Sequence, residues 1–168
     1  LLQRTITLAD FPKMLASSAK VNGVIVPIIA FSLPLAQTLA ALEVPQGFVH
    51  AMTSVTDSET IIILMMIFIL IIAGCVMETT PNIVILAPIM LPLAQEIGMN
   101  EIHFCIMMVT SLGVGFITPP LGLNLFVVSG LTGTPILKVA GKAVPYVLAM
   151  FFVVLLLAFV PQLSTWAL

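Results

Sequence analysis

The chain has 168 residues, of which 61% are hydrophobic and only 7% charged, and its formal net charge is −2. Soluble domains carry about 25% charged residues, so this composition excludes an ordinary soluble domain and indicates an integral membrane protein. The two cysteines, Cys75 and Cys105, lie in apolar runs without Cys-x-x-Cys spacing. We interpret them as small buried apolar side chains with no metal or redox role. Because the chain starts at Leu1 and not at Met, we expect it to be a piece of a longer subunit.

The first apolar segment follows a basic flank. Residues 1–20 carry three of the five basic residues, and Asp10 is suited to cap a short helix over residues 11–19. We expect this flank to be an interfacial connector on the cytoplasmic side. Residues 21–42 contain no charged side chain, and a helix of this length can cross a hydrocarbon core of about 30 Å. Whether this helix is a plain anchor or has a functional polar side remains open.

An acidic connector follows the first crossing. Residues 43–59 hold three carboxylates and no Lys or Arg. A short helix is predicted over residues 45–52, and His50 is interpreted as a solvated loop residue. The sequence Thr56-Asp57-Ser58-Glu59 has the spacing of a capping box, which predicts that the next helix begins there. Residues 21–57 therefore form a transmembrane helix and an outer connector.

Two apolar runs come next, over residues 60–77 and from Pro81 to residue 95, and only the polar turn Glu78-Thr79-Thr80 separates them. The pattern allows two full crossings joined by an exposed loop. It equally allows a hairpin that enters and leaves the membrane on the same side. If Glu78 lies within the membrane, a functional role is the default expectation.

The start of the following helix is marked by several signals. Gly98 is suited to stop the preceding helix, Asn100 to cap the next one, and Glu101 to complement the helix dipole in its first turn. His103 lies one turn further on and is interpreted as an interfacial residue.

The central motif is Gly-Val-Gly-Phe-Ile-Thr-Pro-Pro-Leu-Gly-Leu-Asn, residues 113–124, inside a stretch without Asp, Glu, Lys or Arg. Its prolines remove backbone donors and its glycines add permissive backbone. We predict a membrane helix with a first half over residues 101–115, an unwound link over 116–120 and a second half ending near 131. The alternative is a proline kink that only shapes packing. The pattern favours a binding site, because non-helical backbone at membrane depth must be buried or line a cavity.

The last segment begins with a cytoplasmic loop from residue 132, where Thr134-Pro135 is predicted to start a helix that carries Lys138 and Lys142. Residues 143–168 are free of charge and predict a final crossing that ends near Pro161, with Trp166 as an interface anchor. Basic flanks are cytoplasmic in membrane proteins. The acidic connector, the turn over residues 95–101 and the C-terminus are therefore predicted to face the outside.

The chemistry available near the break consists of oxygen atoms and helix ends. No catalytic motif and no phosphate-binding loop is present, so we do not expect an enzyme. Carbonyl groups freed by a break in a helix can hold a cation, and the N-terminus of the second half-helix can face an anion. The candidate ligands for sodium are the hydroxyl of Thr118 and the carbonyls of Gly113, Gly115, Phe116, Ile117 and Thr118.

Four pieces of the chain resemble the large membrane subunit of tripartite ATP-independent periplasmic (TRAP) transporters, the DctM-like family. The first is residues 70–94, which begin with Leu-Ile-Ile-Ala-Gly-Cys-Val-Met-Glu and end with Ile-Leu-Ala-Pro-Ile-Met-Leu-Pro-Leu-Ala. The others are His-Phe at 103–104, Gly-Phe-Ile-Thr-Pro-Pro-Leu-Gly-Leu-Asn at 115–124, and Phe-Val-Pro-Gln-Leu-Ser-Thr-Trp at 159–166. The resemblance implies an all-α polytopic membrane protein. It implies that this chain is the C-terminal part of the subunit, the second inverted repeat of an elevator-type ion transporter fold.

Further expectations follow from the resemblance. Residues 58–97 would form an outward-side re-entrant hairpin, and residues 98–131 a discontinuous transmembrane helix. A co-transported sodium ion would bind at Gly74, Gly115, Thr118 and Leu121. Substrate would bind near Thr79, Thr80, Pro119, Pro120 and Asn124.

The resemblance also implies partners and a substrate class. The family imports organic acids, such as C4-dicarboxylates and sialic acid, with sodium across the bacterial inner membrane. A periplasmic binding protein delivers the substrate, a small DctQ-like subunit braces the large one, and the N-terminal half of the same subunit completes the site. The alternatives are a stand-alone sodium symporter of the same superfamily and a membrane scaffold that transports nothing.

Glu78 stands where this family usually has Asp. A carboxylate that pointed at an anionic substrate would repel it, so we expect Glu78 to cap or brace the hairpin and not to contact substrate.

Overall fold

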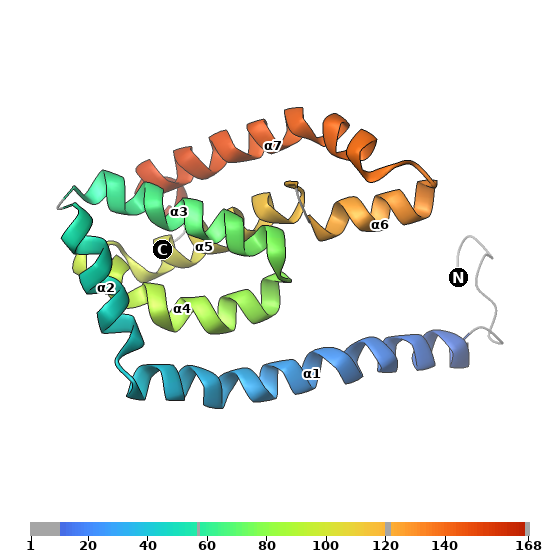
Figure 1. Cartoon of the computed structure of the whole chain (residues 1–168), viewed down its shortest axis with the longest axis horizontal. Helices are drawn as coiled ribbons and strands as arrows, with labels where there is room; N and C mark the ends of the chain where they lie inside the picture. Colours follow the sequence, from blue (N-terminus) through green and yellow to red (C-terminus); the bar gives the residue numbers. More distant parts are fainter. Residues whose placement is uncertain (1–10, 57, 120–121, 167–168) are drawn as a thin grey trace.

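The computed structural model describes residues 11–56, 58–119 and 122–166. In these ranges all regular secondary structure is helical (Figure 1). The eight helices are α1 (Phe11–Ala41), α2 (Val44–Val55), α3 (Glu59–Val76), α4 (Thr79–Glu96), α5 (Glu101–Phe116), α6 (Leu123–Thr132), α7 (Ile136–Phe159) and α8 (Pro161–Thr165). An all-helical architecture agrees with the fold class expected from the sequence.

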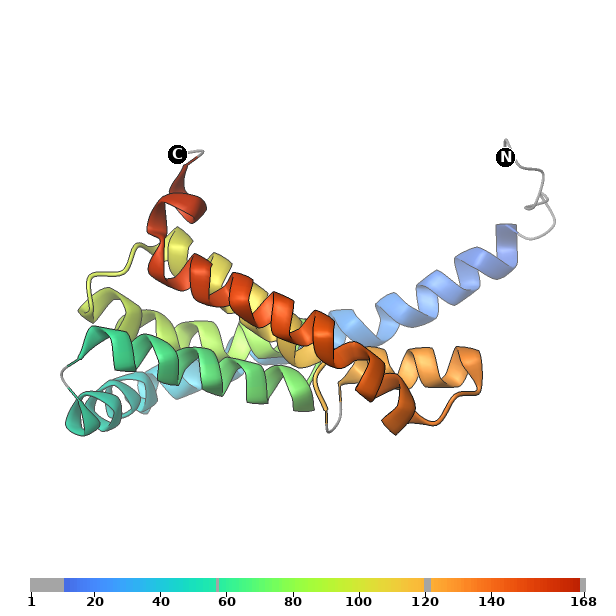
Figure 2. The same cartoon turned by 90° about the horizontal axis from the view of Figure 1, so that it is seen from above.

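The core is formed where α3, α4 and α5 pack together with the C-terminal part of α7 (Figure 1). Its fully buried side chains are mostly methionine and leucine with one phenylalanine, including Met66, Leu70, Met90, Phe104 and Met107. Because lipid tails are as apolar as these side chains, their contribution within a membrane is close packing between the helices. By contrast, α6 and the N-terminal part of α1 extend away from this core (Figure 2), and α6 buries only Leu125.

The first helix differs from the prediction. A separate interfacial piece over residues 11–19 was expected, but α1 runs without interruption from Phe11 to Ala41. The polar residues around Lys20 do not interrupt it, and Pro27 and Pro34 lie inside it. The proposed cap Asp10 lies outside the described residues. A change from charged to apolar composition marks a change of environment and does not by itself end a helix.

The acidic connector contains the predicted short helix, α2, so His50 is an exposed helical residue and not a loop residue. α3 begins at Glu59, as predicted, but the capping box that was expected to start it does not form. The N-cap of α3 is Ser58, which makes no side-chain capping bond. Thr56 Oγ1 instead accepts a hydrogen bond of 3.1 Å from the Ser58 backbone N–H. A threonine two residues before the cap thus satisfies the backbone of the turn and not that of the helix.

The turn between α4 and α5 follows the prediction closely. Gly98 adopts a left-handed φ of 72°, its N–H donates to the Gln95 carbonyl, and the Met99 N–H donates to the Ala94 carbonyl. This is the Schellman arrangement that ends a helix at glycine. The Asn100 side chain then accepts from the N–H groups of the second and third residues of α5, at 2.9 and 3.4 Å, as expected of an N-cap.

His103 was interpreted as an interfacial residue, but it is buried, with 3% of its surface exposed. Its Nε2 lies 2.8 Å from the Leu157 carbonyl oxygen of α7. In a continuous helix that carbonyl would accept from the N–H four residues later, which here is Pro161 and carries no N–H. His103 therefore supplies the donor that Pro161 lacks.

Two smaller differences concern helix starts and cysteines. Pro135, and not Thr134, occupies the N-cap of α7, and the Thr134 carbonyl accepts from the Ser129 hydroxyl at 2.7 Å. Cys75 is buried as predicted, whereas Cys105 is exposed on the outer face of α5.

Apart from Glu78 at the α3–α4 tip, the charged residues of the described ranges lie toward the two ends of the molecule. Glu43 between α1 and α2, Glu59 at the start of α3, Glu96 at the end of α4 and Glu101 at the start of α5 gather at one end (Figure 1). The start of α1, with its two lysines, and the α6–α7 turn, followed by Lys138 and Lys142, lie toward the other end. By length and hydropathy, α3 and α7 qualify as membrane-spanning helices within the described part of the chain.

Candidate functional site

The tip of the α3–α4 hairpin lies beside the break between α5 and α6 (Figures 1 and 2). Both features end at the same level, short of the end formed by the α6–α7 turn and the start of α1. The described chain therefore contains two interrupted helical segments whose interruptions lie side by side.

The contact between them is made by glycine backbone. A Cβ atom added to Gly115 would lie 2.5 Å from the Ile71 carbonyl oxygen and 2.7 Å from the Gly74 Cα. A Cβ on Gly74 would lie 2.5 Å from the Leu112 carbonyl oxygen. Real Cβ contacts are never this short, so only glycine at both positions permits α3 and α5 to approach so closely. The structure thus brings together Gly74 and Gly115, two of the residues predicted to bind sodium.

The break itself is present, shifted slightly from the prediction. Phe116 is still helical, α5 ends there, and α6 begins at Leu123. The N–H of Thr118 donates to the Gly115 carbonyl at 3.0 Å, and its hydroxyl donates to the Val114 carbonyl at 2.6 Å. These bonds tighten the last turn of α5 before the chain leaves the helix.

Gly122, at the N-cap of α6, is surrounded by oxygen atoms of the same break. A Cβ atom there would lie 2.8 Å from the Thr118 carbonyl oxygen and 3.2 Å from that of Phe116. Two backbone oxygens thus approach one point in a buried part of the link. Oxygen is the donor that hard cations prefer, so this link has the chemistry that a sodium site requires.

The hairpin tip consists of only two residues outside the helices, Met77 and Glu78. Glu78 occupies the N-cap of α4, but its side chain is exposed and makes no capping bond. The expectation that its carboxylate caps or braces the hairpin is therefore wrong. That role belongs to Asn82, which sequence reasoning missed. Its buried amide nitrogen donates to the Ala73 carbonyl at 3.0 Å and to the Met77 carbonyl at 3.1 Å.

One sequence signal was available for Asn82. An amide in the first turn of an apolar helix, directly after a proline, is expensive to bury unless it is hydrogen-bonded. The partners could not be read from the sequence, because the acceptor carbonyls belong to the preceding helix, up to nine residues away.

The helix ends give this region a defined electrostatic character. The C-termini of α3 and α5, which carry carbonyl groups without intrahelical partners, meet at Gly74 and Gly115. The N-termini of α4 and α6 begin just beyond these ends. Helix C-termini favour cations and N-termini favour anions. No Lys or Arg occurs between residues 21 and 137, so no basic side chain of that stretch competes with a cation there.

The predicted substrate residues lie around the same ends without contacting one another through hydrogen bonds. Thr79 and Thr80 begin α4 and are half-buried, Pro119 is exposed in the break, and Asn124 is exposed in the first turn of α6. In the described part of the chain, none of these side chains makes a hydrogen bond. Pro120 and Leu121, the remaining predicted site residues, lie outside the described residues.

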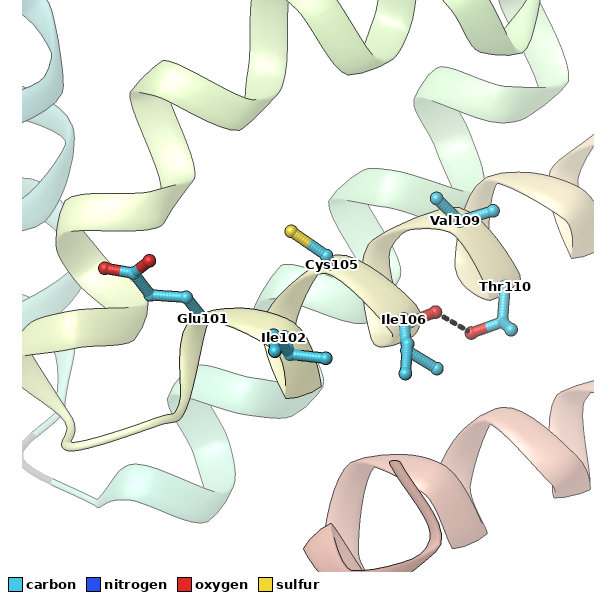
Figure 3. A pocket seen from close by; sticks show the side chains of 6 residues that line it. All are labelled: Glu101, Ile102, Cys105, Ile106, Val109 and Thr110. Atoms are coloured by element: carbon cyan, nitrogen blue, oxygen red, sulfur yellow. Dashed lines mark hydrogen bonds between the residues drawn. The ribbon is translucent and has the colours of Figure 1, made fainter. Parts of the chain in front are cut away.

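A separate groove of about 460 Å³ runs along the outer face of α5 (Figure 3). The side chains that line it all come from α5 and are mostly apolar: Glu101, Ile102, Cys105, Ile106, Val109 and Thr110. The Thr110 hydroxyl donates to the Ile106 carbonyl of its own helix at 2.7 Å. This groove begins at the far end of α5 from the break and shares none of the site residues.

Comparison with known proteins places the chain in a family. Residues 1–163 match the family model of the DctM component of tripartite ATP-independent periplasmic transporters. The chain is 35% identical over 161 residues to the C4-dicarboxylate TRAP transporter large permease protein DctM of Pseudomonas aeruginosa, covering 96% of this chain and 38% of that protein.

Two further relatives bear other substrate names. The isethionate TRAP transporter permease protein DctMQ of Oleidesulfovibrio alaskensis is 32% identical over 162 residues, which is 96% of this chain and 26% of that protein. The 2,3-diketo-L-gulonate TRAP transporter large permease protein YiaN of Escherichia coli is 28% identical over 162 residues, 96% of this chain and 38% of that protein. The chain thus spans well under half the length of these relatives.

The family match extends over nearly the whole chain and includes both the hairpin and the broken helix. This chain belongs to the DctM family of TRAP transporter large permeases, which are transporters and not enzymes.

Proposed function

We propose that this chain is the C-terminal part of a sodium-coupled secondary transporter that imports organic acids. The observation that carries the proposal is the backbone contact of Gly74 with Gly115, which joins the C-terminal ends of α3 and α5. A cation bound there is stabilised by carbonyl oxygens and by two helix dipoles. Gly74, Gly115, Thr118 and Leu121 are the proposed sodium residues.

The organic acid is proposed to bind beside the cation, at the N-terminal ends of α4 and α6. Thr79, Thr80 and Asn124 lie in the first turns of these helices, where N–H groups without helical partners face a carboxylate favourably. Pro119 and Pro120 are the other residues proposed to lie near the substrate. Bound sodium orders the hairpin tip and lowers the electrostatic cost of placing an anion nearby, so each ion raises the affinity for the other.

The hairpin is proposed to be re-entrant, because its tip stops at the level of the break (Figure 2). The acidic end of the bundle then faces the periplasm, the lysines at the other end face the cytoplasm, and the C-terminus is periplasmic. With the N-terminal half of the subunit, the chain forms two inverted repeats that move as an elevator. In a cysteine-free background, E101C should be labelled only from the periplasm and K138C only from the cytoplasm.

The substrate class and partners follow from the relatives. The substrates in the names of three relatives are C4-dicarboxylate, isethionate and 2,3-diketo-L-gulonate, all organic anions. We therefore propose an organic acid of the C4-dicarboxylate or sialic acid class, delivered by a periplasmic binding protein. A small DctQ-like membrane subunit is the proposed brace, and a name such as DctMQ is consistent with such a partner.

The test is uptake of succinate and sialic acid into liposomes that contain the complete complex, with sodium or potassium outside. The binding protein is present in one set and absent in the other. Uptake that needs both sodium and the binding protein is the expected result. Sodium-driven uptake without the binding protein would favour a stand-alone symporter. A folded complex that moves neither substrate nor sodium would favour a scaffold.

A further inference from the structure

We infer that Asn82 is a positioning residue that fixes the hairpin tip in the form that binds the co-transported cation. The inference rests on the proposed sodium coupling, and it assigns a role to a residue outside the proposed site. Asn82 does not contact the cation in this assignment. It acts through the backbone of α3, whose C-terminal end forms one half of the site.

We call the two hydrogen bonds from the Asn82 amide to the Ala73 and Met77 carbonyls the clasp. Asn82 is 2% exposed, and both hydrogen atoms of its amide have acceptors, the carbonyls of Ala73 and Met77. The Asn82 backbone N–H also donates to the Glu78 carbonyl at 3.3 Å. One residue of α4 thus holds the last turn of α3, its C-cap and the N-cap of α4 together.

The clasp borders directly on the glycine contact. Ala73, which accepts from the Asn82 amide, precedes Gly74, whose backbone abuts Gly115. A rotation of the Ala73 peptide would turn the carbonyls that follow it at the end of α3. Because cation sites made of backbone carbonyls depend on the direction of each carbonyl, loss of the clasp should weaken cation binding more than it slows transport.

In the described part of the chain, no other side chain at the tip forms a hydrogen bond across the hairpin. Glu78 makes no capping bond, and no side-chain hydrogen bond of Thr79 or Thr80 exists in the described part of the chain. With only two residues between the helices, the tip has little other means of holding α3 against α4. The amide side chain is therefore the principal polar link across the hairpin.

The experiment uses the complete complex in liposomes and compares N82A and N82Q with the matched control N100A. Asn100 also caps a helix end with its side chain, but it lies at the other end of α5, which is 16 residues long, or about 24 Å at 1.5 Å per residue. Two quantities are measured: the sodium concentration that gives half-maximal uptake, and hydrogen–deuterium exchange of residues 73–82.

N82A should raise the half-saturating sodium concentration by about threefold or more, the size expected from the loss of one or two hydrogen bonds. It should change the maximal rate less, and it should speed exchange at the tip. N82Q, which keeps the amide donor, should recover part of the sodium affinity. N100A should lower thermal stability but leave both the sodium affinity and the tip exchange unchanged.

Equal effects of N82A and N100A on sodium affinity would overturn the inference, as would an N82A complex with wild-type tip exchange. If wild-type uptake does not depend on sodium, the proposed coupling is wrong and the assigned role in cation binding is overturned with it. In that case faster tip exchange in N82A alone would still establish the clasp as a structural brace.

Discussion

Gly74 and Gly115 are in backbone contact, and this contact joins the end of the first hairpin helix to the end of the first half of the broken helix. The two helices can approach this closely because neither glycine has a side chain: a Cβ on Gly115 would lie 2.7 Å from the Gly74 Cα. The backbone of Gly74 and Gly115, which we assign to cation binding, is positioned by this approach of two helices.

The first prediction concerns G115A. The added methyl group meets backbone atoms that cannot rotate away, so α3 and α5 must separate. Overpacking of this kind costs about 1–3 kcal/mol, and the separation should abolish sodium-dependent uptake. Thermal unfolding of the purified complex and liposome uptake measure the two effects.

The control for this variant is G113A in the same helix. A Cβ on Gly113 meets nothing within 4 Å in the described structure, and alanine is favoured over glycine in a helix by about 1 kcal/mol. G113A should therefore retain uptake and unfold at an equal or higher temperature. If G113A and G115A behaved alike, the close approach would not be the reason for the loss.

The second prediction concerns the Thr118 hydroxyl. It donates a hydrogen bond of 2.6 Å to the Val114 carbonyl, so its lone pairs remain able to face a cation. T118A should raise the half-saturating sodium concentration by about fivefold or more, as expected for loss of an oxygen that contacts a charge. T110A removes an equivalent hydroxyl-to-carbonyl bond of 2.7 Å on the outer face of α5 and should leave sodium dependence unchanged. An unchanged sodium dependence in T118A would exclude its hydroxyl from the site.

The third prediction concerns the bond of 2.8 Å between His103 and the Leu157 carbonyl. H103L leaves that partly buried carbonyl without its donor, which should reduce the free energy of unfolding by about 1 kcal/mol. P161A restores a backbone N–H four residues after Leu157. A double-mutant cycle measured by chemical denaturation should show that H103L costs less in the P161A background. A cost that is equal in both backgrounds would mean that His103 stabilises α5 and α7 by packing alone.

The fourth prediction concerns Glu78, an exposed residue without a capping bond. E78Q should change the free energy of unfolding by no more than about 0.5 kcal/mol, as is usual for exposed sites, and should leave the apparent substrate affinity unchanged. Uptake measured over a range of substrate concentrations tests this. A folded E78Q complex with a sharply altered affinity would place the carboxylate beside the substrate.

The sequence by itself determined the helical, apolar character of the chain and several of the positions where helices stop, although not the course of α1. These features are local. Gly98 and Asn100 end and begin helices through bonds to residues at most four positions away, and the Pro-Pro link breaks a helix wherever it stands. The family resemblance rests on the same local motifs, and it is confirmed by the match over residues 1–163.

Tertiary structure decided what the local patterns could not. The burial of His103 depends on a carbonyl 54 residues away, and the role of Asn82 depends on the path of the preceding helix. The Gly74–Gly115 contact joins residues from different helices, so glycine content alone does not reveal it. Capping and helix breaking act through the adjacent backbone, whereas a polar side chain or a glycine in a membrane helix takes its role from whichever helix packs against it.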